Sequence, residues 1–390
     1  MEWVEKKSSE LYVSSSGLSK SSDQFGYGYP FLSYKDVFNN YYAPDKLSTL
    51  VNSTEKDRMK CSVKQGDVFL TRTSETTDEL GMSCVALHDY VNATFNGFTK
   101  RLRPLTDEIE PKYAAYYFRS PYFRSQCISL ASLITRASLN DGMIRRLKIR
   151  YPLNRKVQEK IGEILYTYDT LIENNNKRIR LLEKMAENLY KEWFVRFRFP
   201  GHENVEMENG LPKGWKVKKY EDEFNVKYGK GLPIDKLTKD GFPVFGSNGQ
   251  IGYYTSYMYE TPQILISCRG ASSGVVNISL PKSFITNNSL ICEMTNETES
   301  VFEYLKYCFL NTNLVQYQTG SAQPQITINN IVKLKLLIPS TDVQIKFADK
   351  VRTLDKEVGN LQHQNSLLAR QRDLLLPRLM SGKLEVKVKE

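Results

Sequence analysis

The chain has 390 residues and a mass of 45.0 kDa, which exceeds one ordinary hydrophobic core and predicts two or three domains. Its 41% hydrophobic and 25% charged residues are typical of a globular protein and argue against a disordered chain. The formal net charge of +10 is spread along the sequence, as suits a folded protein that meets a polyanion. Residues 1–7 are charged where a secretory peptide needs an apolar run, and no stretch is apolar enough to span a membrane, so we expect a cytoplasmic protein.

The sequence shows no pattern of a catalytic or metal centre. The six cysteines are scattered without a CxxC pair, and we interpret them as buried thiols. Cys84 and His88 lie four residues apart, but no second ligand pair accompanies them, so no metal site is predicted. The glycines of residues 246–252 are spaced as in a phosphate-binding loop, yet Tyr253 and Tyr254 predict a strand where that loop needs a helix. A GxxxxGK(S/T) loop, the tetrapeptide of methyltransferases that act on exocyclic amines, and a nuclease cluster are also missing, so no catalytic residue or cofactor is assigned to this chain.

Along the chain, mixed β-rich segments alternate with two long helices. Apolar side chains recur at steps of three or four from about residue 155 to 194, and again from about 343 to 380. Each stripe of roughly forty residues makes a helix of about 60 Å, which is longer than a compact domain needs. The predicted boundaries are a first mixed domain over 1–152, a central helix over 153–198, a linker over 199–210, a second mixed domain over 211–340, a C-terminal helix over 341–382 and a tail over 383–390.

The two halves of the sequence are copies. A shift of 186 residues places Val157 on Val343 and Asp169 on Asp355 within the two helices. A repeat of this period predicts two similar units, each a mixed domain followed by a helix. The segments ahead of the helices correspond as well, with residues 138–140 matching 327–329 and residues 66–72 paralleling 262–269.

The mixed segments have a composition that suits contact with DNA. Both are rich in Tyr, Phe, Ser, Thr, Asn and Gln around isolated basic residues, and such side chains read base edges or bind phosphates. A turn-rich β domain has the same composition, so this alone leaves the function open. The candidate DNA-binding residues are Lys20, Ser22, Tyr27, Arg72, Arg136, Lys227, Lys230, Asn248, Gln250, Arg269, Gln323 and Gln325.

Four motifs resemble one protein family. Gln371-Arg-Asp-Leu-Leu-Leu-Pro-Arg-Leu-Met-Ser-Gly-Lys-Leu-Glu-Val386 resembles the C-terminal signature of the specificity (S) subunits of type I restriction–modification systems. Leu211-Pro-Lys-Gly-Trp215 resembles the start of the second target-recognition domain in that family, and residues 320–329 resemble its closing motif. Residues 17–22 with 29–36 resemble one subclass of first domain. The first domain departs from the pattern, since its opening offers only Glu2-Trp3 in place of Leu-Pro-x-Gly-Trp.

The resemblance implies an α+β fold, in which two β-rich target-recognition domains form a pseudo-twofold tandem repeat. Two long helices would join them and pair as an antiparallel coiled coil. Asn175 and Asn365 fall on its apolar seams, where a buried Asn fixes register at a cost in stability, although a solvated position is also open. The helix positions that we expect at subunit interfaces are Ile161, Tyr168, Leu182, Leu354, Leu361 and Leu368.

The resemblance also implies a set of partners. The chain would bind double-stranded DNA, two modification subunits that methylate adenine with S-adenosylmethionine, and restriction subunits that use ATP and Mg²⁺. These cofactors belong to the partners, and the chain itself would read a bipartite target without catalysis. A stand-alone DNA-binding regulator is one alternative, but it would not need such long helices. A single-chain restriction–methylation enzyme is another, and it would need the catalytic motifs that are missing.

Overall fold

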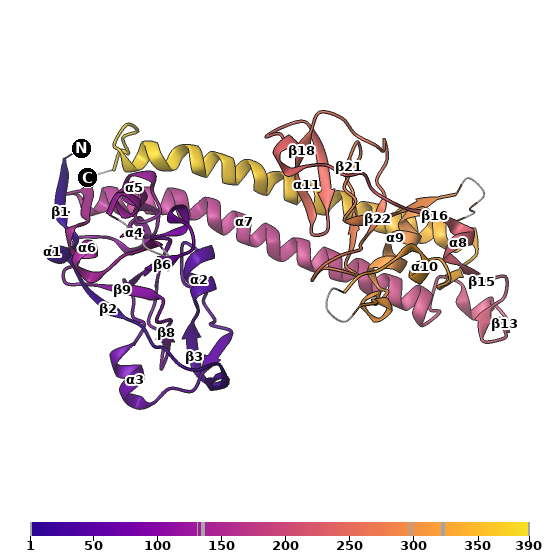
Figure 1. The fold of residues 1–390 in the computed structure, drawn as a ribbon, viewed down its shortest axis with the longest axis horizontal. Helices are drawn as coiled ribbons and strands as arrows, with labels where there is room; N and C mark the ends of the chain where they lie inside the picture. The colour runs from indigo at the N-terminus through magenta and orange to yellow at the C-terminus, as the bar shows by residue number, and fades with distance from the viewer. Residues whose placement is uncertain are drawn as a thin grey trace. The chain divides into compact units, whose positions relative to one another are not determined.

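The computed structural model describes residues 2–130, 132–133, 137–295, 298, 300–320 and 324–388 (Figure 1). Two compact units divide the chain. Unit 1 comprises Met1–Asn176 and His363–Glu390, and unit 2 comprises Lys177–Gln362. Two long helices, α7 (Arg155–Tyr190) and α11 (Thr341–Met380), each run from one unit into the other, so each unit contains part of both.

Unit 1 is built on a four-stranded antiparallel sheet of order β2-β9-β5-β7 and a three-stranded sheet of order β4-β3-β8. A two-stranded sheet joins β1 to β12, and a small sheet of order β10-β11-β6 lies in the same unit. The strands are β1 (Trp3–Lys7), β2 (Tyr12–Ser16), β3 (Phe25–Leu32), β4 (Thr49–Val51), β5 (Val68–Thr71), β6 (Thr73–Ser74), β7 (Ser83–Val85), β8 (Thr94–Phe95), β9 (Thr99–Pro104), β10 (Ser132–Leu133), β11 (Ala137–Ser138) and β12 (Lys148–Pro152). The short helices are α1 (Ser8–Leu11), α2 (Tyr34–Asn39), α3 (Glu55–Lys60), α4 (Pro111–Tyr117), α5 (Pro121–Leu130) and α6 (Asp141–Arg146).

Unit 2 repeats this plan. Its four-stranded sheet has the order β16-β22-β19-β20, its three-stranded sheet the order β18-β17-β21, and β15 pairs with β23 as β1 pairs with β12. The strands are β13 (Met207–Glu208), β14 (Leu211–Pro212), β15 (Lys216–Lys219), β16 (Phe224–Tyr228), β17 (Phe242–Gly246), β18 (Gly249–Tyr254), β19 (Ile264–Ser267), β20 (Val276–Ile278), β21 (Phe284–Ile285), β22 (Ser289–Met294) and β23 (Lys335–Ile338). The short helices are α8 (Tyr220–Glu223), α9 (Phe302–Leu310) and α10 (Ile328–Ile331).

The predicted fold class is confirmed: two β-rich domains accompany two long helices that pack together. Helix α7 ends in a π-helical turn, Lys191–Val195, so the helical segment stops close to the predicted residue 194. Helix α11 accommodates Pro377 in its last turns and continues to Met380. The proline removes one backbone N–H from the ladder, and this loss is smallest near a helix end, where few further hydrogen bonds depend on it.

Each domain is bound to the start of the helix that follows it by an equivalent glutamine. The Gln158 side chain accepts from the Glu110 backbone N–H at 2.9 Å and donates to the Pro152 carbonyl at 2.8 Å. In unit 2, the Gln344 side chain accepts from the Val301 backbone N–H at 2.8 Å and donates to the Pro339 carbonyl at 2.9 Å. Both glutamines are fully buried, so their amides tie the helix start to the domain where water cannot compete.

A tyrosine–aspartate hydrogen bond further along each long helix is also common to both units. Tyr116 donates to Asp169 in unit 1, and Tyr307 donates to Asp355 at 2.8 Å in unit 2. The aspartates are the pair that the 186-residue shift superimposes, so the internal repeat extends to side-chain contacts. Burial, together with the neighbouring carboxylate, raises the pKa of both tyrosines, so both phenols remain protonated donors at neutral pH.

Trp3 resolves the irregular start of the first domain. Strand β1 pairs with β12 from Trp3, and the backbone N–H of Lys7 donates to Glu10 as that of Lys219 donates to Asp222. Counting back four residues from each lysine makes Trp3 the equivalent of Trp215. The first domain therefore keeps the tryptophan of the Leu-Pro-x-Gly-Trp motif, with Glu2 at the place of its glycine.

The helix pair is antiparallel in each unit, and one layer differs between them. In unit 1, Asn175 Nδ2 donates to Asn365 Oδ1 at 3.0 Å, and Asn175 is 8% exposed. The shift of 186 residues relates these positions to Leu361 and Ile179 in unit 2, which are both buried. The buried interpretation of Asn175 is therefore the correct one, and an amide pair replaces an apolar pair in one of two equivalent layers.

We predict that the asparagine layer is coupled. Asn175→Leu alone should lower the free energy of unfolding by about 1–3 kcal/mol, because the Asn365 amide loses a buried partner. Adding Asn365→Ile reproduces the apolar pair of unit 2 and should recover at least that amount, as a double-mutant cycle in urea would measure. Arg178→Ala with Glu357→Ala, which removes an exposed ion pair of 2.8 Å, is the control and should change stability by less than about 1 kcal/mol. Additive losses at Asn175 and Asn365 would contradict the prediction.

Candidate nucleic-acid interface

Arg269 and Gln325 are brought together in unit 2, although they lie far apart in the sequence. They form an isolated antiparallel bridge, and both side chains are exposed. The Gln325 backbone also exchanges hydrogen bonds with Thr319, at 2.8 and 2.9 Å, which fixes its position. A guanidinium and an amide side by side on one exposed edge are the groups that read guanine and adenine in a major groove.

The equivalent edge of unit 1 carries Arg72. Its carbonyl accepts from the Leu139 N–H at 2.8 Å, as the Cys268 carbonyl accepts from the Ile326 N–H at 3.0 Å. Leu139 therefore corresponds to Ile326, and the predicted match of residues 138–140 with 327–329 is wrong by two residues, as the helix caps Asn140 and Thr327 also show. Arg72 is therefore equivalent to Cys268 and not to Arg269. The two arginines occupy neighbouring, not identical, positions of the repeated segment. Because successive residues of an extended chain point to opposite sides, this offset gives the two arginines different directions. Arg72 is half-buried, whereas Arg269 is exposed.

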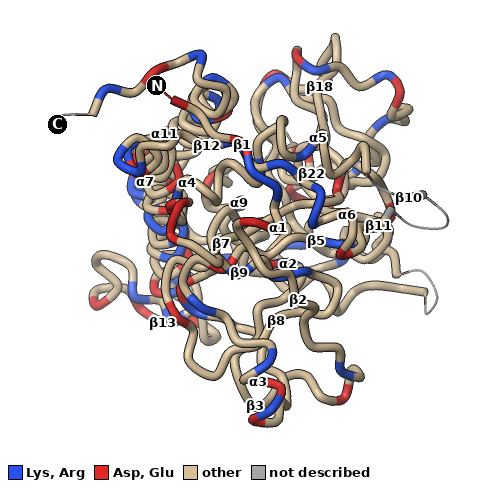
Figure 2. Tube along the Cα trace, turned by 90° about the vertical axis from the view of Figure 1, so that its left-hand side faces the viewer, with Lys and Arg blue, Asp and Glu red and all other residues tan. Residues whose placement is uncertain are grey.

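The first-domain candidates Lys20, Ser22 and Tyr27 lie on the short segment that leads into and along β3. Lys20 forms an ion pair of 3.1 Å with Asp57 of α3. Ser22 begins an exposed 3₁₀ turn, Ser22–Gln24, and the Tyr27 side chain is 50% exposed. Figures 1 and 2 both place β3 and α3 at the end of unit 1 away from α7.

The second-domain candidates differ in how free their side chains are. Lys227 forms an ion pair of 2.5 Å with Glu293, and this carboxylate raises the lysine pKa. Its charge is therefore compensated within the domain, which weakens it as a phosphate ligand. Lys230 is exposed, and its backbone N–H is fixed by the Ile285 carbonyl at 2.9 Å.

Asn248 and Gln250 lie at the β17–β18 turn. Asn248 accepts a hydrogen bond from Ser272, and the Gln250 amide lies 3.4 Å from the Gly252 carbonyl. Tyr253 and Tyr254 belong to β18, which confirms that a strand follows the glycines of residues 246–252. Two further candidates, Arg136 and Gln323, lie outside the residues that the structure describes.

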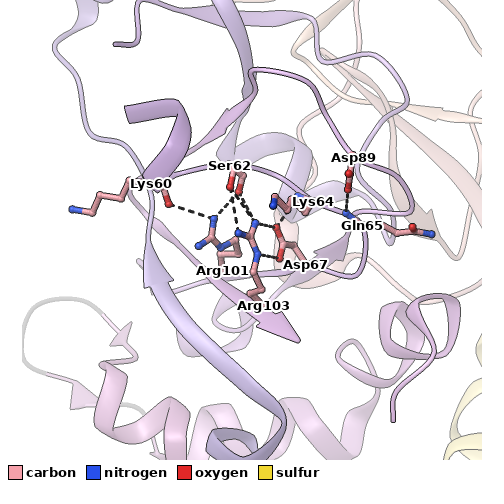
Figure 3. A network of polar contacts seen from close by, with 8 residues as sticks. All are labelled: Lys60, Ser62, Lys64, Gln65, Asp67, Asp89, Arg101 and Arg103. Carbon is pink, nitrogen blue, oxygen red and sulfur yellow. Dashed lines mark hydrogen bonds and ion pairs between the residues drawn. The ribbon is translucent and has the colours of Figure 1, made fainter. Parts of the chain in front are cut away.

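A buried arginine network supports α3, and the sequence analysis did not include it (Figure 3). Asp67 is fully buried and accepts from Arg103 at 2.8 and 2.6 Å. Arg101 donates to the Ser62 carbonyl at 2.6 Å and reaches the Lys60 carbonyl, the last of α3, at 3.4 Å. The hydrogen bond with Asp67 raises the pKa of Arg103, whereas burial lowers the pKa of Arg101. Asp67 is therefore the ion-pair partner of Arg103, and Arg101 is held by carbonyl oxygens.

This network fixes the loop between α3 and β5 to strand β9. Arg101 and Arg103 are two apart on a strand and therefore face the same side of the sheet. That alternation was visible in Lys100-Arg-Leu-Arg103, but only the fold shows that Asp67 lies opposite. The corresponding positions of unit 2, reached through the paired strands β19 and β22, carry Gln263, Ile291 and Glu293, so the network belongs to the first domain alone.

The predicted interface positions on the helices fall into two groups. Ile161 and Leu361 are buried, so they stabilise the helix pair and its domains. Tyr168, Leu182, Leu354 and Leu368 are half-buried. The apolar side chains that α7 and α11 present to solvent are Leu171, Leu181, Met185, Ile345, Leu367 and Leu374.

Neither a metal centre nor a membrane helix is found in the part of the chain that the structure describes. No group of three His, Cys, Asp or Glu side chains there could hold a metal ion. Among the same residues, no helix has the length and apolar character needed to cross a membrane. Cys84 is fully buried, and burial raises the pKa of its thiol, while His88 stacks on Tyr90 with ring centroids 4.0 Å apart.

The fold defines a tandem repeat of two β-rich domains, each packed on parts of two long helices. Comparison with known proteins agrees: the model of the type I restriction modification DNA specificity domain matches residues 2–184 and 212–369. The chain belongs to this family of type I restriction–modification specificity subunits, and the resemblance seen in its motifs is confirmed.

Full-length relatives support the assignment. The Type I restriction enzyme MjaIX specificity subunit of Methanocaldococcus jannaschii is 26% identical over 417 residues, covering 99% of this chain and 94% of that protein. The HindI specificity subunit of Haemophilus influenzae is 21% identical over 446 residues, covering 91% of this chain and 94% of that protein. The crystal structure of a type I restriction–modification S subunit from M. genitalium has a TM-score of 0.57 at 18% identity, with 100% of this chain and 97% of that chain covered.

We predict that the arginine network stabilises the first domain strongly. Asp67→Ala leaves the half-buried Arg103 without its carboxylate and should lower the free energy of unfolding by about 1.5–3 kcal/mol. Glu293→Ala removes the half-exposed pair with Lys227 in unit 2 and should cost less than about 1 kcal/mol. Urea denaturation of both variants gives the comparison, and equal losses would show that burial of Asp67 adds nothing to its ion pair.

Proposed function

We propose that this subunit reads a bipartite DNA target, with one half-site for each β-rich domain. The observation that carries the proposal is the duplication of the segment that follows β5 and β19, which carries Arg72 in the first domain and Arg269 in the second, at positions one residue apart. Two copies of one scaffold with different exposed residues suit two half-sites of different sequence. DNA readers built on a twofold axis bind half-sites at a fixed spacing.

The candidate contacts divide by chemistry. We assign Arg269 and Gln325 to base edges, because they are exposed, adjacent and able to form bidentate contacts. Lys230 is the better phosphate candidate of the two basic residues near β16, since Lys227 is paired with Glu293. Lys20, Ser22, Tyr27, Asn248 and Gln250 remain proposed contacts, and so do Arg136 and Gln323.

The subunit would act through partners and not through chemistry of its own. We propose that two modification subunits bind it and methylate adenine with S-adenosylmethionine, and that restriction subunits cleave DNA with ATP and Mg²⁺. The exposed leucines and Met185 on α7 and α11 offer apolar surface for these subunits, and such patches mark protein contacts. The cytoplasm, where the cell's DNA lies, is the proposed location. The helices argue against a stand-alone regulator, because that function needs no such surface.

Domain exchange tests the division of the target. Replacing residues 211–337 by the second recognition domain of another family member should change one half of the methylated sequence and preserve the other. Genome-wide mapping of methylated adenines in cells that carry the modification subunit is the measurement. The matched control exchanges the first domain and should change the opposite half. A hybrid that alters both halves together would overturn the assignment of one half-site to each domain.

The length of the helices should set the distance between the half-sites. The domains pack on the helix starts through Gln158 and Gln344, so an insertion belongs between the units, after Asn176 in α7 and after Gln362 in α11. Four helix-forming residues in both helices add about 6 Å and a rotation of about 40°. One base pair of DNA adds about 3.4 Å and a tenth of a turn, so the methylated target should gain one or two base pairs between unchanged halves. An active variant with the original spacing would show that helix length does not set it.

A further inference from the structure

Strand β3 contains a three-residue bulge at its exposed end. Phe25 and Tyr29 both pair with Val51 of β4, so the residues between them, Gly26-Tyr27-Gly28, loop out of the sheet. Both glycines adopt φ of +95°, a region that L side chains rarely occupy. A bulge leaves its extra residues unpaired and re-aims their side chains, and such bulges occur next to functional sites.

A loop also leaves the sheet at the equivalent place in unit 2. The carbonyls of Leu32 and Phe245 accept equivalent hydrogen bonds, from Asn96 at 3.1 Å and from Thr286 at 2.9 Å, which aligns β3 with β17. Counting back from these residues places Gly28-Tyr-Pro30 on Gly241-Phe-Pro243. Thr238 and Phe242 pair with Tyr253 and Tyr254, neighbours on β18, so residues 239–241 loop out of the second sheet.

The final glycine of each bulge is required by the backbone. Gly28 and Gly241 have φ of +95° and +120°, and a Cβ on either would lie 2.6 Å from a carbonyl oxygen of the adjacent strand. Those oxygens belong to Val51 and Tyr254, which hold the same place beside the two bulges. The duplicated chain has therefore kept this last glycine, while the rest of the loop differs: Gly26-Tyr27 in one copy, with φ of +95° at Gly26, and Lys239-Asp240 in the other, where Lys239 has no positive φ.

The first bulge is held rigidly at both ends. Before it, the backbone and side chain of Asn52 each donate to Gln24 at 2.8 Å. After it, the Arg58 guanidinium stacks on the Tyr29 ring, 3.8 Å from its centroid, and donates to the Ser53 carbonyl at 2.5 Å. Arg58 belongs to α3, whose last carbonyl lies within reach of Arg101 in the arginine network. A rigid base with an exposed tip loses little entropy when the tip binds.

Tyr27 at the tip has no role in the fold. Its side chain is 50% exposed, and within the part of the chain that the structure describes it makes no hydrogen bond and no ring contact. An ideal Cβ at Gly26 would meet nothing within 4 Å, so the glycine before the tip also faces open space. The flat, rigid and exposed ring is chemically suited to the π-face of a nucleobase, on which aromatic side chains stack without regard to sequence.

We propose that the two bulges are equivalent DNA-contacting loops, and that Tyr27 inserts against a base step of the first half-site and stacks on a partly unstacked base. The inference rests on the proposed reading of DNA by this domain and adds the mode of contact. Apolar or aromatic wedges that enter a base step open it and kink the duplex. The second loop, with Lys239 and Asp240 at its tip, offers no ring, so the distortion is confined to the first half-site.

Fluorescence of 2-aminopurine, which rises when this base is unstacked, tests the proposal. The complex with the modification subunits is titrated with duplexes of the mapped target, each with 2-aminopurine at one adenine in or beside the first half-site; the methylated adenine is left out, because methyltransferases extrude their target base. We expect a rise at one position with the unmodified protein. Tyr27→Ala should abolish it and weaken binding about tenfold, the scale of one lost base–aromatic stack, whereas Tyr27→Phe and Tyr27→Trp should retain both.

Two controls separate stacking from general damage. Tyr122→Ala removes another tyrosine of unit 1, 42% exposed and outside the bulge, and Asp240→Ala alters the second bulge; both should leave the rise intact. The unfolding temperature of Tyr27→Ala should be unchanged. The proposal is overturned if no position shows a rise with the unmodified protein, or if Tyr27→Ala keeps it. If the wild-type complex did not bind the target sequence specifically, the proposed function itself would be overturned.

Discussion

The structure depends on one constraint: neither β-rich domain encloses a complete core with its own segment of chain. The core of unit 1 is closed by Leu376, Leu379 and Met380 at the end of α11. The core of unit 2 is closed by Tyr190, Trp193 and Phe194 at the end of α7. Each long helix therefore begins on one domain and ends in the other, and burial of these large side chains makes helix pairing a condition for folding either domain.

The same constraint explains the aromatic residues after α7. Trp215 at the start of the second domain packs on Phe194, Phe197 and Phe199, with ring centroids 5.2 to 6.0 Å apart. In unit 1 the equivalent Trp3 packs on Gly382, where a Cβ would lie 2.8 Å from the indole nitrogen. The tryptophan thus packs on three phenylalanine rings in unit 2 and on a glycine in unit 1. Both arrangements fill the space between a helix end and the start of a domain. Position 382 of the C-terminal signature is a glycine because a side chain there would overlap Trp3.

Periodicity and repetition in the sequence were sufficient to predict the long helices, the two mixed domains and the equivalence of Asp169 with Asp355. These features are local or follow from a constant shift. The predicted equivalence of Arg72 with Arg269 was wrong by one residue, because residues 262–269 contain one residue more than residues 66–72 and only hydrogen bonds fix the register. The Asp67–Arg103 pair and the bulge at Tyr27 were beyond prediction, since each depends on which strands the fold places side by side.

Comparison of the two units separates what the scaffold requires from what varies on it. Gln158, Tyr116 and Gly28 have equivalents in unit 2 that make the same contacts, so these positions satisfy buried polar groups or a backbone without room for a side chain. The exposed residues of the same elements, such as Tyr27 in one unit against Asp240 in the other, differ in size and charge. Changes at such positions cost little stability because they bury nothing. The exposed residues of the two domains can therefore change independently, while the buried amides and the shared helix pair preserve the fold of both.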